Sequence, residues 1–84
     1  MHQVVLYTRD GCCLCDDARV VLERVRLEDP SAFVLDERDI DSDDALHRAY
    51  LEQIPVVTID GEEAFKLFVN EAELRHRLGI VQTR

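Results

Sequence analysis

Three cysteines lie within four positions of this chain, at Cys12, Cys13 and Cys15. Their odd number and tight clustering do not fit the disulfide framework of a small secreted domain. The segment from Cys12 to Cys15 is instead a C-x-x-C element, a spacing that serves thiol–disulfide exchange or forms part of a metal site. The thiol groups therefore indicate redox chemistry, with metal binding as the alternative.

Metal binding would use soft thiolate ligands, which zinc, copper(I) and iron–sulfur clusters prefer. A zinc site normally needs a second pair of ligands, and the chain has no second C-x-x-C element. The histidines, His2, His47 and His76, fall in other predicted elements. The pattern therefore favours a redox-active pair, and a metal or iron–sulfur protein that uses the same thiols is the alternative function.

The cysteines open a predicted helix from Cys13 to about Leu27. Apolar residues recur at the spacing of one buried helix face: Leu14, Ala18, Val21, Leu22 and Val25. Charged residues lie on another face at spacings that allow ion pairs: Asp16, Arg19, Glu23 and Arg26. Pro30 ends this helix at or before Asp29, because proline disfavours helical backbone in the residue before it.

The start of this helix suits a reactive thiolate. Free N–H groups and the positive end of the helix dipole stabilise negative charge there and lower the pKa of a thiol. Cys12 precedes the helix and should lie at its exposed tip, where Arg9 adds positive potential. Cys15 lies in line with Ala18 and should be buried, whereas Cys13 falls on a mostly polar flank. We therefore expect Cys12 to attack, Cys15 to resolve the mixed disulfide and Cys13 to be a bystander.

Short strands and helices alternate along the chain. His2–Thr8 is a predicted strand whose apolar run indicates burial on both faces, and Arg9-Asp10-Gly11 ends it. Another strand is expected at Ala32–Leu35 and could run on toward Ile40. A second helix follows, with Asp41 or Ser42 as its cap. Its predicted apolar stripe consists of Ala45, Leu46, Ala49 and Tyr50.

The last third of the chain supplies a hairpin and a final helix. Pro55–Ile59 and Glu63–Phe68 are predicted strands around Asp60-Gly61, a pair typical of a type I′ turn. Asn70 and Glu73 form a capping box for a helix that Gly79 ends. The element order β-α-β-α-β-β-α implies an α/β fold. Because a strand–helix–strand start pairs its strands in parallel, we expect a mixed four-stranded sheet with helices on both faces.

The segment Tyr7-Thr8-Arg9-Asp10-Gly11-Cys12-Cys13-Leu14-Cys15-Asp16 resembles the active site of glutaredoxin-like proteins, closest to the small bacterial group with C-x-L-C and a following acid. Ile54-Pro55 is similar to the cis-proline element of the same thioredoxin superfamily, and the element order agrees along nearly the whole chain. The resemblance implies a thioredoxin/glutaredoxin-like fold in one domain, residues 1–84, with Cys12 and Cys15 as the redox pair.

The resemblance also implies where a substrate or glutathione would bind. Arg9 occupies the position of the cationic glutathione contact, and Ile54 and Pro55 form the loop that would face the thiols. The region 68–71, however, lacks the glycine pair found in relatives that hold glutathione. We therefore expect a thiol–disulfide oxidoreductase that acts on protein or low-molecular-weight disulfides. Its electron donor would be glutathione or a reductase, and it would hold no tightly bound cofactor.

Composition and charge narrow the partners. The chain has 84 residues, 46% of them hydrophobic and 33% charged, which fits one globular domain. Ten lysines and arginines against 18 acids give a formal net charge of −8, which argues against nucleic acid and anionic membranes as partners. No stretch resembles a signal peptide or a membrane span, so we expect the protein in the cytoplasm. We also expect it to be a monomer.

Overall fold

Four strands form one mixed sheet in the order β2-β1-β3-β4. The structure is a computed structural model that describes residues 2–80 of the chain. Its elements are β1 (His2–Thr8), α1 (Cys13–Glu28), β2 (Phe33–Asp39), the 3-10 helix η1 (Ile40–Ser42), α2 (Asp44–Tyr50), β3 (Val56–Ile59), β4 (Glu62–Lys66) and α3 (Glu71–Leu78). β1 runs parallel to β2 and antiparallel to β3, which pairs antiparallel with β4. The predicted element order and mixed sheet are confirmed.

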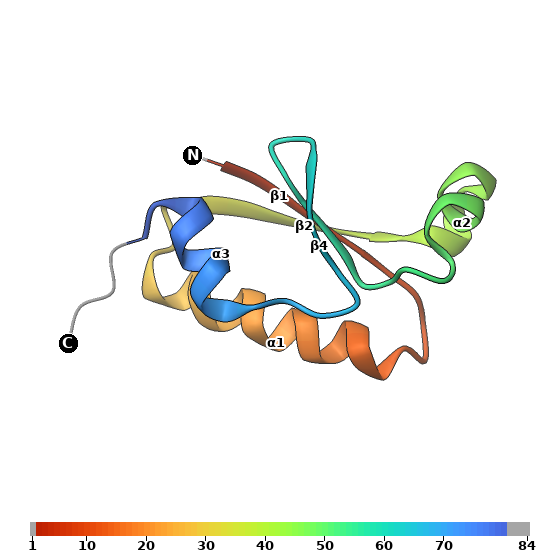
Figure 1. Ribbon diagram of the computed structural model, residues 1–84, viewed down its shortest axis with the longest axis horizontal. Coiled ribbons are helices and arrows are strands. Elements are labelled where there is room, and N and C mark those ends of the chain that lie inside the picture. The colour runs from red at the N-terminus through yellow and green to blue at the C-terminus, as the bar shows by residue number, and fades with distance from the viewer. Residues whose placement is uncertain (1, 81–84) are drawn as a thin grey trace.

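α1 and α3 lie side by side on one face of the sheet, where they form the core with the strands (Figure 1). The buried residues of α1 are Cys15, Ala18, Leu22 and Val25, the line predicted from their spacing. They belong to or adjoin a core cluster of Val4, Leu6, Phe33, Val57, Val69, Leu74 and Leu78. Among residues 2–80, no helix is both long and apolar enough to cross a membrane.

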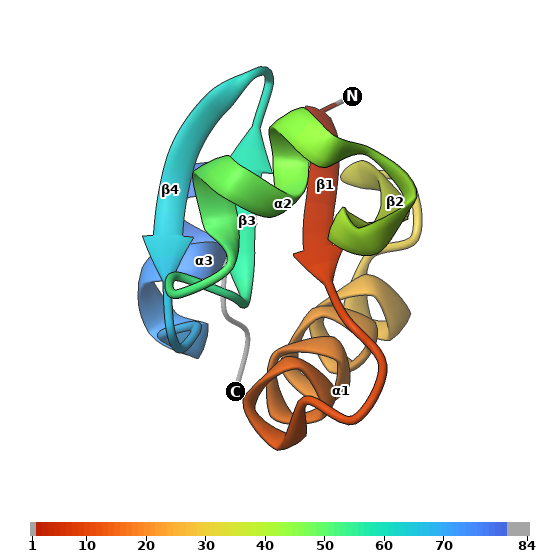
Figure 2. The ribbon, with the colours of Figure 1, turned by 90° about the vertical axis from the view of Figure 1, so that its right-hand side faces the viewer.

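The opposite face of the sheet is only partly covered. Val5 and Tyr7 alternate with the buried residues of β1 and are half-buried, so the predicted burial of this strand on both faces is wrong. Figures 1 and 2 show α2 on the other side of the sheet from α1, and Tyr50 of α2 lies with its ring centroid 4.9 Å from that of Tyr7. Ala45 and Ala49 are exposed, because this short helix covers only the end of the sheet.

The connection from β2 to α2 differs from the prediction. The strand continues to Asp39, and a turn of 3-10 helix follows, anchored by the fully buried Ile40. The cap of α2 is Asp43, whose side chain accepts a hydrogen bond from the N–H of Ala45. Asp41 and Ser42 are not caps of α2, because both belong to the 3-10 turn.

The β3–β4 hairpin turns where the sequence predicts. Asp60 and Gly61 have φ values of 53° and 86°, the left-handed values that a type I′ turn requires. β4 is shorter than predicted, because it ends at Lys66. Leu67 has a φ of 70°, which takes the chain out of the sheet and leaves Phe68 outside the strand.

α3 begins and ends as predicted. The side-chain oxygen of Asn70 accepts a hydrogen bond from the N–H of Glu73 at 2.9 Å. Gly79 ends the helix with left-handed backbone, and the N–H of Ile80 donates to the carbonyl oxygen of Arg75. Both ends of this helix are therefore set by residues adjacent in the sequence.

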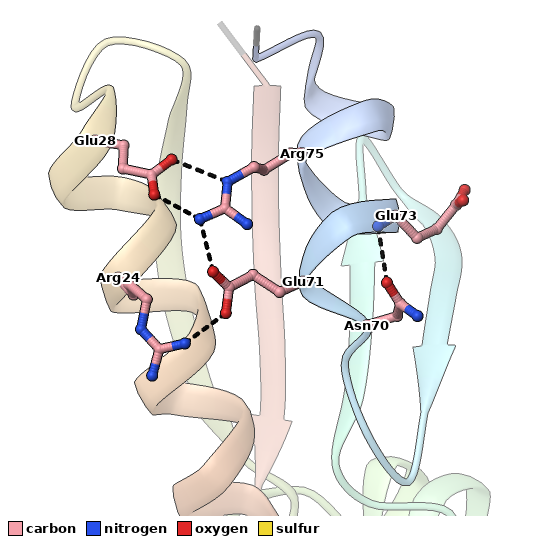
Figure 3. Close-up of polar contacts among 6 residues, drawn as sticks. All are labelled: Arg24, Glu28, Asn70, Glu71, Glu73 and Arg75. Atoms are coloured by element: carbon pink, nitrogen blue, oxygen red, sulfur yellow. Dashed lines mark hydrogen bonds and ion pairs between the residues drawn. The ribbon is translucent and has the colours of Figure 1, made fainter. Parts of the chain in front are cut away.

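An ion-pair network joins α3 to the C-terminal half of α1 (Figure 3). Arg75, whose side chain is 10% exposed, donates to both carboxylate oxygens of Glu28 and pairs with Glu71. Glu71 also accepts a hydrogen bond from Arg24. Hydrogen bonds from Arg75 lower the pKa of Glu28 and of Glu71, and the same bonds raise the pKa of Arg75. The network therefore holds the two helices together while both carboxylates are ionised.

We expect Arg75→Met to lower the Tm at neutral pH by on the order of 5 °C, because two carboxylates lose their main partner. Folding lowers the pKa of Glu28 and Glu71 below about 4.5. Their contribution is therefore complete above that pH and is lost as pH falls through the lowered folded-state pKa. Wild type should consequently lose more Tm on acidification than the variant does.

Thermal unfolding followed by circular dichroism measures both effects. Arg26→Met is the matched control, because it removes an exposed i,i+3 pair with Glu23 from α1 and should change the Tm little. Identical melting curves for wild type and Arg75→Met at neutral and acid pH would contradict the role given to the network.

Candidate active site

The C-x-x-C element lies between the end of β1 and the first turn of α1. β1 ends at Thr8, and four residues carry the chain to the helix. Gly11 has a φ of 77°, a conformation that side chains with a Cβ atom adopt only at a cost, so glycine suits this turn. Cys12 is then the N-cap of α1, with extended backbone. The loop therefore places Cys12 at the positive end of the helix dipole.

Cys12 and Cys15 form a disulfide, and their Cα atoms are 5.2 Å apart. The backbone N–H of Cys15 donates to Sγ of Cys12 at 3.1 Å, so the sulfur occupies the place of a capping oxygen. Cys15 has no exposed surface, Cys12 is half-buried, and Cys13 is a free thiol on the surface. The predicted burial of Cys15 and exposure of Cys13 are confirmed.

Charged side chains near the thiols pair with one another. Arg9 donates from Nε to Oδ2 of Asp41 at 3.0 Å, which ties the loop to η1. Asp16 pairs with Arg19, and Arg19 also binds Glu37 of β2, whose hydrogen bond raises the pKa of the guanidinium. Asp41 offsets part of the positive potential expected from Arg9. The assignment of Arg9 as a glutathione contact stays a prediction.

The Ile54–Pro55 loop lies at the same end of the sheet as the cysteines. Tyr7 of β1 pairs with Val56 of β3, so the residues before Val56 reach the edge where β1 leads into the cysteine loop. The Ile54–Pro55 peptide bond is cis, and Pro55 is fully buried. The carbonyl oxygen of Pro55 accepts a hydrogen bond from the N–H of Leu67 at 2.9 Å. A binding role for Ile54 and Pro55 stays a prediction.

An apolar groove beside the cysteines has no counterpart among the sequence-based predictions. Leu14 is predicted to be buried but is 49% exposed, because Cys15 takes the inward direction and adjacent helical residues point about 100° apart. Phe68 is predicted to lie in a strand and is 67% exposed. The groove is lined by Leu14, Asp17, Ala18, Val21, Leu67, Phe68 and Val69. The apolar run Leu67–Val69 is the one sequence signal that could have indicated it.

The metal-binding alternative lacks a complete ligand set within residues 2–80. In this part of the chain no group of three or more His, Cys, Asp or Glu side chains is placed to hold a metal ion. A tetrahedral metal on Cys12 and Cys15 would therefore need ligands from a second copy of the chain. The alternative stays a prediction, which metal analysis of the purified protein tests.

The sheet order, the parallel β1-α1-β2 unit and the C-x-x-C element at the start of α1 define a protein of the thioredoxin-like fold. Residues 3–79 match the sequence model of the glutaredoxin-like domain family (DUF836), and the chain belongs to this family. The predicted family and fold class are confirmed. The closer resemblance to the group with C-x-L-C stays a prediction.

Solved structures of the same fold come from several organisms. A protein from X. campestris is 32% identical, with a TM-score of 0.74 over 94% of this chain and 99% of its own. A protein from Nitrosomonas europaea is 26% identical, with a TM-score of 0.75 over 90% and 89% of the two chains. A thioredoxin variant from Halobacterium salinarum is 22% identical, with a TM-score of 0.65 over 92% and 71%, and shares the fold alone. No curated protein matches the chain.

We expect Cys12 to be the most reactive thiol of the reduced protein. The N–H of Cys15 and the helix dipole both favour its thiolate, so it should be alkylated fastest at neutral pH. Cys15 should react slowest because it is fully buried. Alkylation by iodoacetamide across a range of pH, with sites assigned by tandem mass spectrometry, measures the three rates. Faster alkylation of Cys15 than of Cys12 at neutral pH would show that the two roles are reversed.

Proposed function

We propose that this protein is a thiol–disulfide oxidoreductase that exchanges a Cys12–Cys15 dithiol with the disulfides of proteins or small molecules. The observation that carries the proposal is the hydrogen bond from the N–H of Cys15 to Sγ of Cys12 at the start of α1. This arrangement combines a stabilised, accessible sulfur with a second, buried sulfur one helical turn away. Membership of the glutaredoxin-like family supports the same chemistry.

The first step is the attack of the Cys12 thiolate on one sulfur of a substrate disulfide. The substrate S–S bond breaks, a disulfide between Cys12 and the substrate forms, and the leaving thiolate takes a proton from water. Before the attack, the N–H of Cys15 and the helix dipole hold the negative charge on Cys12. Partial exposure of Cys12 gives the substrate access to this sulfur.

Cys15 then completes the exchange. Its thiol loses a proton and attacks Sγ of Cys12, which forms the Cys12–Cys15 disulfide and releases the second substrate thiol. In the oxidised form the two Cα atoms are 5.2 Å apart, within the range that a disulfide needs. The substrate has gained two electrons from the protein, and the burial of Cys15 has kept its sulfur away from competing disulfides.

A thiol donor must return these electrons, and we propose glutathione or a reductase in this role. Arg9 would contact a carboxylate of glutathione, beside the loop of Ile54 and Pro55. Two features count against tight glutathione binding: Arg9 is paired with Asp41, and residues 68–71 contain no glycine. Both donors operate where thiols are kept reduced, so we propose that the protein acts in the cytoplasm.

Replacement of each cysteine tests the assignment of roles. We expect Cys12→Ser to abolish disulfide reduction, and Cys15→Ser to stop after the first step with the substrate bound to Cys12. Cys13→Ser should keep most of the activity, because Cα atoms of adjacent residues are about 3.8 Å apart, too close for an unstrained disulfide. Turnover assays and mass spectrometry of the trapped adduct measure these outcomes. Equal inactivity of Cys13→Ser and Cys12→Ser would mean that the vicinal pair takes part in the mechanism.

A coupled assay distinguishes the two electron donors. The protein is supplied with a small disulfide substrate and either glutathione with glutathione reductase or a thioredoxin reductase system, and NADPH consumption is followed. Because residues 68–71 lack the glycine pair of relatives that hold glutathione, we expect the reductase system to support at least as much turnover as glutathione does. Turnover with glutathione and glutathione reductase but none with the thioredoxin reductase system would contradict this expectation. Cys12→Ser provides the blank for both arms of the assay.

A further inference from the structure

Three large apolar side chains are exposed around the groove beside the disulfide. Leu14, Leu67 and Phe68 are 49%, 50% and 67% exposed, and all three line it. The other exposed large apolar side chains in residues 2–80 do not line this groove. Single exposed apolar residues are ordinary on protein surfaces, but several that converge on one hollow are typical of a binding site.

The groove begins within the reactive element. Leu14 directly precedes Cys15, and it forms one wall of the groove. The opposite wall includes Leu67, whose N–H donates to the carbonyl oxygen of Pro55 and so ties this wall to the cis-proline loop. Because Leu14 lies two positions after Cys12, we expect the residues that flank a substrate disulfide at Cys12 to reach this wall of the groove.

The size of the groove indicates what it can hold. Its volume is about 80 Å³, whereas sites for whole small-molecule ligands measure roughly 300–1,000 Å³. The groove therefore fits one side chain of a larger partner. Because most of its lining is apolar, the side chain that gains most from burial there is itself apolar.

Leu67 has an unfavourable backbone conformation at the groove wall. Its φ of 70° lies in the left-handed region, which costs free energy in any residue that carries a Cβ atom. The hydrogen bond from its N–H to Pro55 holds this backbone, but the residue is half exposed, so its side chain packs only partly within the chain. Glycine would adopt the same backbone without strain but would remove the side chain from the groove. A binding role for this side chain accounts for leucine at the position.

Charge favours a cationic partner. Asp17 is the charged residue that lines the groove. A second hollow at the cysteine loop is lined by Asp10, Asp16 and Asp39 and by Arg9 and Arg19. Both arginines are paired with carboxylates, Arg9 with Asp41 and Arg19 with Asp16 and Glu37, so the acids outnumber the bases around this loop. The chain as a whole carries a formal net charge of −8. A basic segment would therefore be attracted to this end of the molecule, more strongly at low salt.

We infer that the groove is a substrate subsite for an extended, cationic peptide segment. It receives a bulky apolar side chain that is adjacent, in the peptide, to the reacting cysteine. This inference rests on the proposed function, because the groove selects substrates only if Cys12 exchanges disulfides. Glutathione fits the groove poorly. Only γ-glutamate and glycine flank its cysteine, so it offers no bulky apolar side chain. Its carboxylates also outnumber its ammonium groups, so it is not cationic. The substrates selected by the groove are therefore protein disulfides.

Single-turnover reduction of defined peptide disulfides tests the inference. The protein is reduced, freed of reductant and mixed with symmetric disulfides of capped pentapeptides, whose central cysteine is flanked by lysine on one side and by leucine or serine on the other. Formation of the Cys12–Cys15 disulfide is followed by acid quenching and mass spectrometry. We expect the leucine peptide to react roughly 10-fold faster than the serine peptide. Replacing lysine with glutamate should slow the reaction, and added salt should reduce that difference.

Variants of the groove wall connect the preference to the structure. Phe68→Ser and Leu67→Gly should each bring the leucine-to-serine rate ratio close to one. Leu67→Gly accepts the φ of 70° without strain, so it should melt no lower than wild type, and loss of the preference cannot then come from unfolding. Leu27→Ser is the matched control, because Leu27 is 78% exposed on α1 and lies outside the groove. It should keep the wild-type ratio.

Several outcomes would overturn the inference. A wild-type ratio near one, or faster reduction of oxidised glutathione than of the leucine peptide, would do so and leave the proposed function intact. Self-association in the ultracentrifuge that Phe68→Ser abolishes would assign the groove to a second copy of the chain. If wild type reacts with no disulfide faster than Cys12→Ser does, the proposed function itself fails and the subsite fails with it.

Discussion

The packing of α1 against β1 and β3, the two inner strands of the sheet, determines where Cys12 and Cys15 lie. Ala18, Leu22 and Val25 are buried on one face of the helix, and rotation of the helix would expose them. Burial of a side chain such as Leu22 stabilises the fold by about 1.5–3 kcal/mol, so the rotation of α1 is strongly determined. With this rotation set, Cys15 points inward one turn before Ala18, and Cys12 is left at the rim as the N-cap.

The same packing connects stability with chemistry. A helix begins with N–H groups that have no partner within the helix, and an ordinary protein satisfies one of them with a hydroxyl or carboxylate cap. Here the cap is the sulfur of Cys12, which accepts the N–H of Cys15. The bond that completes the first turn of α1 is therefore also the bond that, in the proposed function, would stabilise a thiolate on Cys12.

α3 completes the other side of the site. Leu74 packs in the common core, and Arg75 ties α3 to α1 through Glu28. Asn70 caps α3 and so fixes the point at which the preceding segment 67–69 ends. The side chains of this segment line the groove together with Leu14 and other residues in the first turns of α1. α3 thus stabilises the C-terminal half of α1 and also positions the wall of the groove that lies near the N-terminus of α1.

Local patterns in the sequence determined the order of the elements, the inward direction of Cys15, the Asp60-Gly61 turn and the caps of α3. Each depends on residues within about four positions of one another, where helical phase or turn geometry permits few alternatives. The tertiary structure alone decided that the chain leaves β4 at Leu67 and that Arg9 pairs with Asp41. These outcomes depend on contacts between segments far apart in the chain. The sequence around an apolar or charged residue is the same whether or not a distant segment comes into contact with it, so the sequence alone cannot predict the contact.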